Sequence, residues 1–155
     1  MDMKNIMMSD EESAEEKIIM PALYKLSVMD NRYLAESMSE YGLSAIMIRA
    51  LSQIELTPGI SQDTLAYYLA VDKATVTRTV DKLESSGLIA RSISEKDRRC
   101  KLLYIKDDGA KMAAVIKAKK GEWRKILFDG MSKQQLDVLA CLLMRMYNNA
   151  ENADK

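Results

Sequence analysis

The stretch from Ser61 to Lys106 has the sequence SQDTLAYYLAVDKATVTRTVDKLESSGLIARSISEKDRRCKLLYIK, and its first half contains two helical patterns in quick succession. Apolar residues recur at helical spacing over 62–70 and 73–86, at Leu65, Ala66, Leu69, Val76, Val80 and Leu83. Ser61 and Asp72 stand directly before the two patterns, and both are residue types that cap helix N-termini. The first half of the stretch therefore predicts two short helices joined by a tight turn.

The second half of the stretch predicts a β-hairpin. Gly87 fits the left-handed position that closes many helices. Apolar and polar residues then alternate loosely over 88–94, and a second apolar-rich run covers 101–105, which is typical of two half-buried strands. The wholly charged segment 95–99 lies between them and predicts a tight, charged tip.

Longer helical patterns flank this stretch on both sides. We expect a helical region over 13–42, a helix after it, and two long helices within 107–150. Pro21 predicts either a kink or a new helix start, because proline cannot donate a hydrogen bond to the preceding turn. Residues 1–12 are Met-rich and acidic, and we expect a flexible tail there. The predicted fold is mainly α with a small β-hairpin wing.

The terminal helical regions, 13–42 and 107–150, are too apolar to lie bare on a monomer. An exposed apolar surface of that size usually marks an interface between proteins. We therefore expect these regions to be dimerisation helices and expect 43–106 to form a separate lobe.

The formal net charge is zero, but the charge is unevenly distributed. From Asp72 to Lys106 there are nine Lys and Arg against five Asp and Glu, whereas residues 1–16 carry six acids and one Lys. A DNA-binding face needs only local positive charge, so the zero total does not exclude one.

The chain has no His and two Cys, and this composition argues against a structural zinc site. Its longest apolar run, Val138–Met144, is far shorter than the ~20 residues that cross a membrane. The N-terminus is acidic where a signal peptide is basic. We expect a cytoplasmic protein with no membrane association.

The order helix, tight turn, helix and hairpin is that of a winged helix-turn-helix, whose second helix enters the major groove of double-stranded DNA. The apolar residues occupy one face of that helix, so its other face is available to DNA, with Lys73, Thr75, Thr77, Arg78 and Lys82. Lys and Arg can bind guanine edges or phosphates, and Thr can bind phosphates or touch a thymine methyl. The caps Ser61 and Asp72 are expected near the DNA backbone. The alternative is an ordinary amphipathic surface helix of mixed charge.

The hairpin tip supplies a second expected DNA contact, made by Lys96, Asp97, Arg98, Arg99 and Lys101. A narrow minor groove concentrates negative potential and attracts arginine. Neighbouring side chains on a strand point in opposite directions, so we expect Arg98 to insert and Arg99 to pair with Asp97. The alternative is a solvated charged turn that contacts nothing.

Four segments of the sequence resemble motifs of the MarR family of bacterial and archaeal regulators. Ile60–Ala66 resembles its "(L/I)TQxELA" segment, and Val71–Arg78 is similar to its recognition-helix consensus. Leu83–Ile89 matches "LExxGLI", and Asp97–Arg99 matches the wing signature Asp-x-Arg. Counting helix order, the resemblance extends from Leu23 to Tyr147. The chain lacks the Cys near the first helix used by peroxide-sensing members and the His used by metal-sensing members.

The resemblance implies a homodimeric regulator, usually a repressor, that binds a pseudo-palindromic operator. It also implies a small phenolic or anionic effector, bound between the dimerisation helices and the DNA-binding lobe, that lowers DNA affinity. Candidate lining residues are Tyr33, Met38, Met47, Arg49, Tyr67 and Tyr68. The alternative is that these residues pack the core or lie on the surface, as Met and Tyr at helical spacing usually do.

Other functions remain as alternatives. The lobe could be a winged-helix module that binds protein rather than DNA, although Arg78, Lys82 and Arg98 argue against it. Cys100 beside the wing could make the protein a thiol-responsive regulator, although a structural strand Cys is the simpler interpretation. Cys141 is expected in the core. No nucleophile–base pair, phosphate loop or metal spacing is present, so we expect neither an enzyme nor a cofactor.

Overall fold

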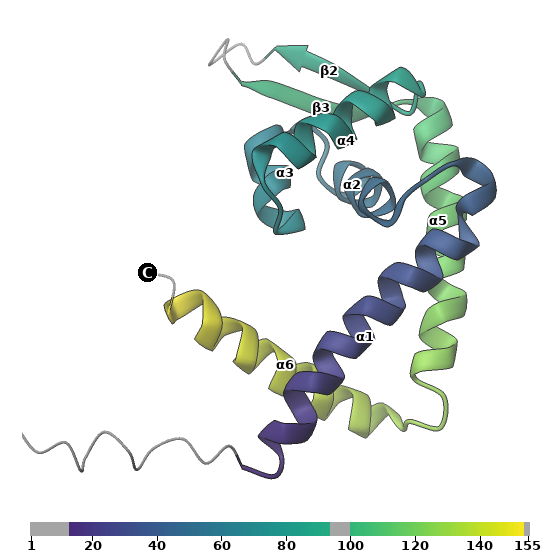
Figure 1. The fold of residues 1–155 in the computed structure, drawn as a ribbon. Helices are drawn as coiled ribbons and strands as arrows, with labels where there is room; N and C mark the ends of the chain where they lie inside the picture. The colour runs from purple at the N-terminus through teal and green to yellow at the C-terminus, as the bar shows by residue number, and fades with distance from the viewer. Residues whose placement is uncertain (1–12, 94–99, 154–155) are drawn as a thin grey trace, which may run out of the picture. The chain divides into compact units, whose positions relative to one another are not determined.

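The computed structural model describes residues 13–93 and 100–153 (Figure 1). Its elements are α1 (Glu16–Ser37), the 3-10 turn η2 (Ser39–Tyr41), α2 (Ala45–Leu56), β1 (Ile60–Ser61), α3 (Gln62–Leu69), α4 (Lys73–Ser85), β2 (Ile89–Ile93), β3 (Lys101–Ile105), α5 (Asp107–Leu127) and α6 (Lys133–Ala153). The chain divides into two compact units between Lys119 and Lys120. The mainly α-helical prediction is confirmed, whereas the predicted tail, 1–12, lies outside the described residues.

The helices α3 and α4 form the predicted helix-turn-helix, and side-chain caps fix the start of each. Ser61 Oγ accepts the backbone N–H of Thr64 at 3.0 Å, and Asp72 Oδ1 accepts that of Thr75 at 2.8 Å. Each cap satisfies a backbone donor that has no partner inside its helix. Between the helices Ala70 adopts a left-handed conformation with φ 53°, so the chain turns sharply.

The wing sheet has three antiparallel strands rather than the predicted two, in the order β1-β3-β2. In its middle row Leu103 of β3 lies opposite Ile60 on one side and Arg91 on the other. The sequence does not predict β1 because a two-residue strand directly before a helix is too short to show alternation. The extra strand joins the start of α3 to the wing.

The core of the first unit fixes the orientation of α4. Leu51, Ile54 and Leu103 are fully buried, and three apolar side chains of α4 pack with them, Val76, Val80 and Leu83. Thr79 is buried on the same helix, and its hydroxyl donates to the carbonyl of Thr75 at 2.8 Å, so it needs no outside partner. The burial predicted for α4 from the sequence is therefore confirmed, and its remaining surface faces outward.

The helix α1 is continuous through Pro21, so the predicted new helix start there is wrong. Proline removes one N–H, which leaves only the carbonyl of Lys17 without its intrahelical partner. The helix start is held by a capping box, in which Glu16 N donates to Ser13 Oγ at 3.1 Å and Ser13 N donates to Glu16 Oε2 at 2.7 Å. One lost hydrogen bond does not end a helix of 22 residues.

The helix α6 begins with the predicted capping box and extends beyond its predicted end. Ser132 N donates to Gln135 Oε1 at 2.8 Å, and Gln135 N donates to Ser132 Oγ at 3.2 Å. No described side chain of α6 is buried. Cys141 is accordingly exposed, and its expected place in the core is wrong. No helix among the described residues is both long and apolar enough to span a membrane.

Candidate nucleic-acid interface

The residues predicted to contact DNA from α4 divide between two sides of the helix. Lys73 and Thr77 line a hollow between α4 and the wing sheet. Arg78 and Lys82 are exposed and do not line that hollow. Thr75 is half-buried. The helix therefore presents one polar edge toward the wing and one basic edge away from it.

A chain of hydrogen bonds leads from the start of α4 to Arg78. Thr75 Oγ1 donates to Asp72 Oδ2 at 2.7 Å and accepts a hydrogen bond from Arg78 Nη2 at 3.1 Å. The hydroxyl and backbone N–H of Thr75 both bind the carboxylate and hold the pKa of Asp72 below its usual range. In the single chain, Thr75 thus orients its neighbours on the surface of α4.

An ion pair connects the two helices of the motif. Lys73 Nζ lies 2.8 Å from Asp63 Oδ1, and both side chains are exposed. Solvent screening makes such a pair weak, so it does not remove Lys73 from the set of available cations. The sequence analysis did not identify Asp63, because the partner lies on a different helix and no local spacing relates the two.

The structure assigns Arg91 to a contact that the sequence analysis counted only as charge. On β2, Arg91 forms ion pairs with Asp81 at 2.5 Å and Glu84 at 2.6 Å, both on α4. The acids stand three residues apart, which places them on one side of the helix. That spacing is the only signal in the sequence, and it does not indicate which cation the acids bind.

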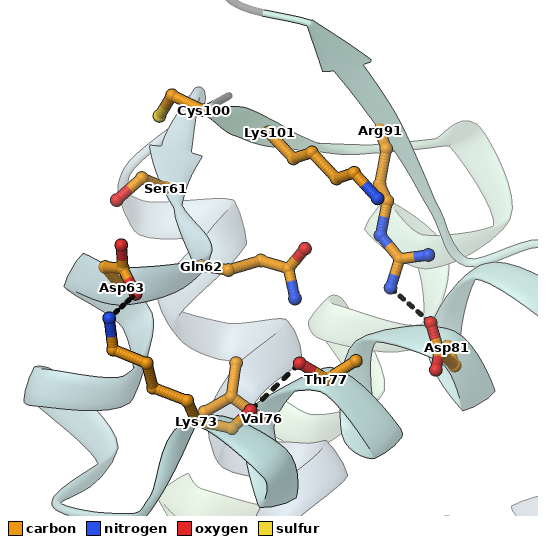
Figure 2. A pocket seen from close by; sticks show the side chains of 10 residues that line it. All are labelled: Ser61, Gln62, Asp63, Lys73, Val76, Thr77, Asp81, Arg91, Cys100 and Lys101. Carbon is orange, nitrogen blue, oxygen red and sulfur yellow. Dashed lines mark hydrogen bonds and ion pairs between the residues drawn. The ribbon is translucent and has the colours of Figure 1, made fainter. Parts of the chain in front are cut away.

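The hollow beside these groups has a volume of about 490 Å³ and opens between the start of α3, α4 and the sheet. Figure 2 shows Arg91 and Lys101 on its sheet side and the Asp63–Lys73 pair on its helix side. The predicted cap Ser61 and the half-exposed Cys100 also line it. Cations and hydroxyls on both walls can bind anionic oxygens, such as those of a phosphate backbone.

The predicted tip of the wing lies outside the described residues, and this includes Lys96, Asp97, Arg98 and Arg99. Lys101, at the start of β3, is described and exposed. Of the wing residues predicted to bind DNA, the structure therefore places only Lys101.

The residues proposed for an effector pocket lie in different surroundings. Met38 and Met47 are buried in the core, and Tyr33 packs partly buried against it. Arg49 donates from Nη2 to the carbonyl of Leu69 at 3.2 Å. The two remaining residues are exposed and form an edge-to-face pair at 5.9 Å, Tyr67 and Tyr68. Among the described residues, no group of three His, Cys, Asp or Glu could hold a metal ion.

Known proteins are similar to this chain in sequence and in architecture. Residues 43–101 match the model of the MarR family. The chain is 29% identical over 113 residues to the HTH-type transcriptional regulator YdgJ of Bacillus subtilis, a match that covers 73% of this chain and 69% of that protein. A MarR transcriptional regulator from Methanosarcina mazei is similar in structure, with a TM-score of 0.79, 27% identity, and coverage of 87% of this chain and 98% of that one. A MarR family regulator from Listeria monocytogenes in complex with 26mer DNA has a TM-score of 0.76 at 22% identity, over 84% of this chain and 89% of that one.

Proposed function

We propose that this chain, which is similar to MarR family transcriptional regulators in sequence and structure, is a DNA-binding regulator that represses transcription by binding a pseudo-palindromic operator as a homodimer. The observation that carries the proposal is the surface of α4. Its apolar side is buried in the core, whereas Thr77, Arg78 and Lys82 are exposed. A rigidly held helix with a basic outer edge is suited to the major groove.

The homodimer is supported by the uncovered surface of α6. This helix has 21 residues, and its large apolar side chains include Val138, Leu139 and Leu142, which lie side by side and are 36–59% exposed. Contiguous exposed apolar surface of this kind marks an interface. We assign 13–42 and 107–150 to dimerisation and 43–106 to DNA binding. A two-fold dimer would place its recognition helices on half-sites ~34–36 Å apart.

The wing is proposed to add a minor-groove contact. This part of the proposal rests on the sequence Lys96-Asp97-Arg98-Arg99, with Arg98 inserted and Arg99 paired to Asp97. Lys101 follows on the described strand β3 and is exposed toward the same hollow. The caps Ser61 and Asp72 are proposed to lie near phosphates, because helix N-termini attract anions.

The proposed effector is a small phenolic or anionic molecule that lowers operator affinity. This step is supported by the similarity to the MarR family and not by the placement of the candidate residues, since Met38 and Met47 are buried. A thiol-based response through Cys100 is the second candidate for regulation, and the half-exposed position of that thiol is the observation in its favour.

Selection of bound duplexes from a random library tests the main proposal. We expect enrichment of an inverted repeat, and we expect affinity for it to fall steeply with salt, because phosphate contacts release counterions. Arg78→Ala should relax the preference at one base pair per half-site. Arg32→Ala removes an exposed arginine from α1, loosely paired with Glu36 at 4.0 Å, and serves as the matched control. A protein-binding module would enrich no sequence and show only weak, uniform binding to DNA.

A further inference from the structure

Arg91 on β2 connects the wing to α4, the proposed recognition helix, through two ion pairs. Its guanidinium is the shared partner of Asp81 and Glu84, and its side chain is only 18% exposed. The Asp81 and Glu84 side chains are 57% and 39% exposed, so the ion pairs are buried on the Arg91 side and remain open to solvent on the other. Salt therefore weakens them in part.

Both terminal nitrogens of the Arg91 guanidinium are bound to carboxylates of α4. Nη1 donates to Glu84 Oε2 and Nη2 donates to Asp81 Oδ1. Nε is buried and lacks a hydrogen-bond partner in the described part of the chain. The positive charge of Arg91 is therefore paired with two carboxylates of α4, although the residue lies on the DNA-binding lobe.

The position of Arg91 on the hairpin gives this contact its significance. Arg91 lies opposite Leu103, which is fully buried. Farther out on the hairpin, Ser92, Ile93 and Lys101 are all exposed. Leu102, which lies opposite Ser92, is only half-buried, so burial decreases along the hairpin beyond Arg91. In the described part of the hairpin, the ion pairs of Arg91 are the outermost polar contact with α4.

We infer that Arg91, Asp81 and Glu84 form a clamp that fixes the angle between the β2–β3 hairpin and α4, so that both can contact DNA at once. This inference rests on the proposed operator binding. Arg91 is a positioning residue, because it acts through Lys101 on the hairpin and Arg78 on the helix. A partly buried ion pair adds little net stability, since desolvation offsets the attraction, but its paired hydrogen bonds are directional. The clamp therefore determines geometry more than stability.

The two acids provide the sharpest test, because electrostatics and positioning predict opposite signs. The variants Asp81→Asn and Glu84→Gln each remove a negative charge beside the DNA-binding surface. Electrostatics alone predicts tighter binding from either change. The clamp predicts weaker binding, because a hairpin that is no longer held occupies the DNA-competent position for a smaller fraction of the time. Asp63→Asn is the matched control, since it removes an acid at the same hollow without touching Arg91.

The experiment measures affinity of the full chain for its selected operator, together with a hydroxyl-radical footprint. For the combined Asp81→Asn and Glu84→Gln variant we expect binding weakened about tenfold, which corresponds to a competent fraction of about one tenth. Protection should be lost where the hairpin contacts DNA and retained where α4 does. Arg91→Ala should give the same footprint, and Asp63→Asn should bind as tightly as the wild type or more tightly.

Three results would overturn the clamp. The combined acid variant could bind as well as the wild type or better, as electrostatics alone predicts. It could lose both parts of the footprint together along with its thermal stability, which would make the ion pairs structural only. Arg91→Ala could lose protection at an α4 contact instead. If the wild-type protein itself selects no duplex, the proposed function fails rather than the clamp.

Discussion

The start of α5 passes so close to the wing that only glycine fits at position 109, and this yields a quantitative prediction. A Cβ built on Gly109 would lie 2.0 Å from the carbonyl oxygen of Leu88 and 2.8 Å from Cγ1 of Ile105. Real Cβ atoms essentially never approach another heavy atom within 3.0 Å. The same Leu88 oxygen accepts the N–H of Lys106 at 3.0 Å, so moving it away also endangers that hydrogen bond. Gly109→Ala must therefore displace backbone.

Opposing contributions decide the size of the effect. Alanine favours a helix over glycine by at most about 1 kcal/mol. Overpacking a tight site costs about 1–3 kcal/mol, and losing a backbone hydrogen bond costs about 1 kcal/mol more. The clash outweighs the helix propensity, and we expect Gly109→Ala to lower the free energy of unfolding by about 1–3 kcal/mol. For a chain of this size, that lowers Tm by roughly 3–10 °C.

Urea denaturation followed by circular dichroism measures this effect. The control is Gly121→Ala in the same helix, where the nearest atom to an added Cβ is Arg124 Nη2 at 3.9 Å. The free energy of unfolding of Gly121→Ala should rise by up to about 1 kcal/mol, because alanine has the higher helix propensity. All variants are compared at one protein concentration, because the proposed dimerisation links stability to concentration. If Gly109→Ala matches or exceeds the wild type in stability, the close packing of α5 on Leu88 is refuted.

Three further predictions test the caps and the interface. Ser61→Ala should lower the free energy of unfolding by about 1 kcal/mol, whereas Ser44→Ala should change it little, because the side chain of Ser44 makes no capping hydrogen bond; equal losses would contradict the cap. Folding lowers the pKa of Asp72, so the ionised carboxylate stabilises the folded chain at pH values above its unfolded pKa of about 4. This contribution to the free energy of unfolding is lost as the pH falls through the lower, folded pKa. The free energy of unfolding of Asp72→Asn should therefore fall less steeply at acid pH than that of the wild type. An unchanged pH dependence would contradict the stabilising role of the Asp72 carboxylate. Leu142→Glu should give monomers in sedimentation velocity with helicity retained, and a persistent dimer would remove α6 from the interface.

The elements that the sequence predicted well are those coded by neighbouring residues. Ser61 and Asp72 bind backbone N–H groups three residues ahead, so the residue type and its place in the chain suffice to predict them. Gly87 has φ 74°, the left-handed conformation expected at the end of the helix before it. The capping box at Ser132 and Gln135 is equally local. In each case the physical cause lies within one helical turn.

The elements that the sequence did not predict depend on contacts between segments. The strand β1 exists because Ile60 pairs with Leu103, far away in the chain. Pro21 was expected to interrupt α1, but the rest of a long helix tolerates one missing donor. Cys141 was expected in the core because its neighbours are apolar, yet it is exposed and no described side chain of α6 is buried. A periodic pattern shows which face is apolar and cannot show what covers that face.

Charge counting illustrates the same limit and explains how a neutral chain presents a basic surface. The count from Asp72 to Lys106 adds Arg91 to the positive charge and sets Asp81 and Glu84 against it. In the structure Arg91 pairs with both acids at the boundary between α4 and β2, and the three side chains together carry one net negative charge. At 100° per residue, Lys82 projects about 100° from Asp81 and about 160° from Glu84, whereas Arg78 lies only about 60° from Asp81 around the helix. The two acids therefore hold the wing while leaving one net negative charge beside the DNA-binding surface, which is why their removal separates positioning from electrostatics.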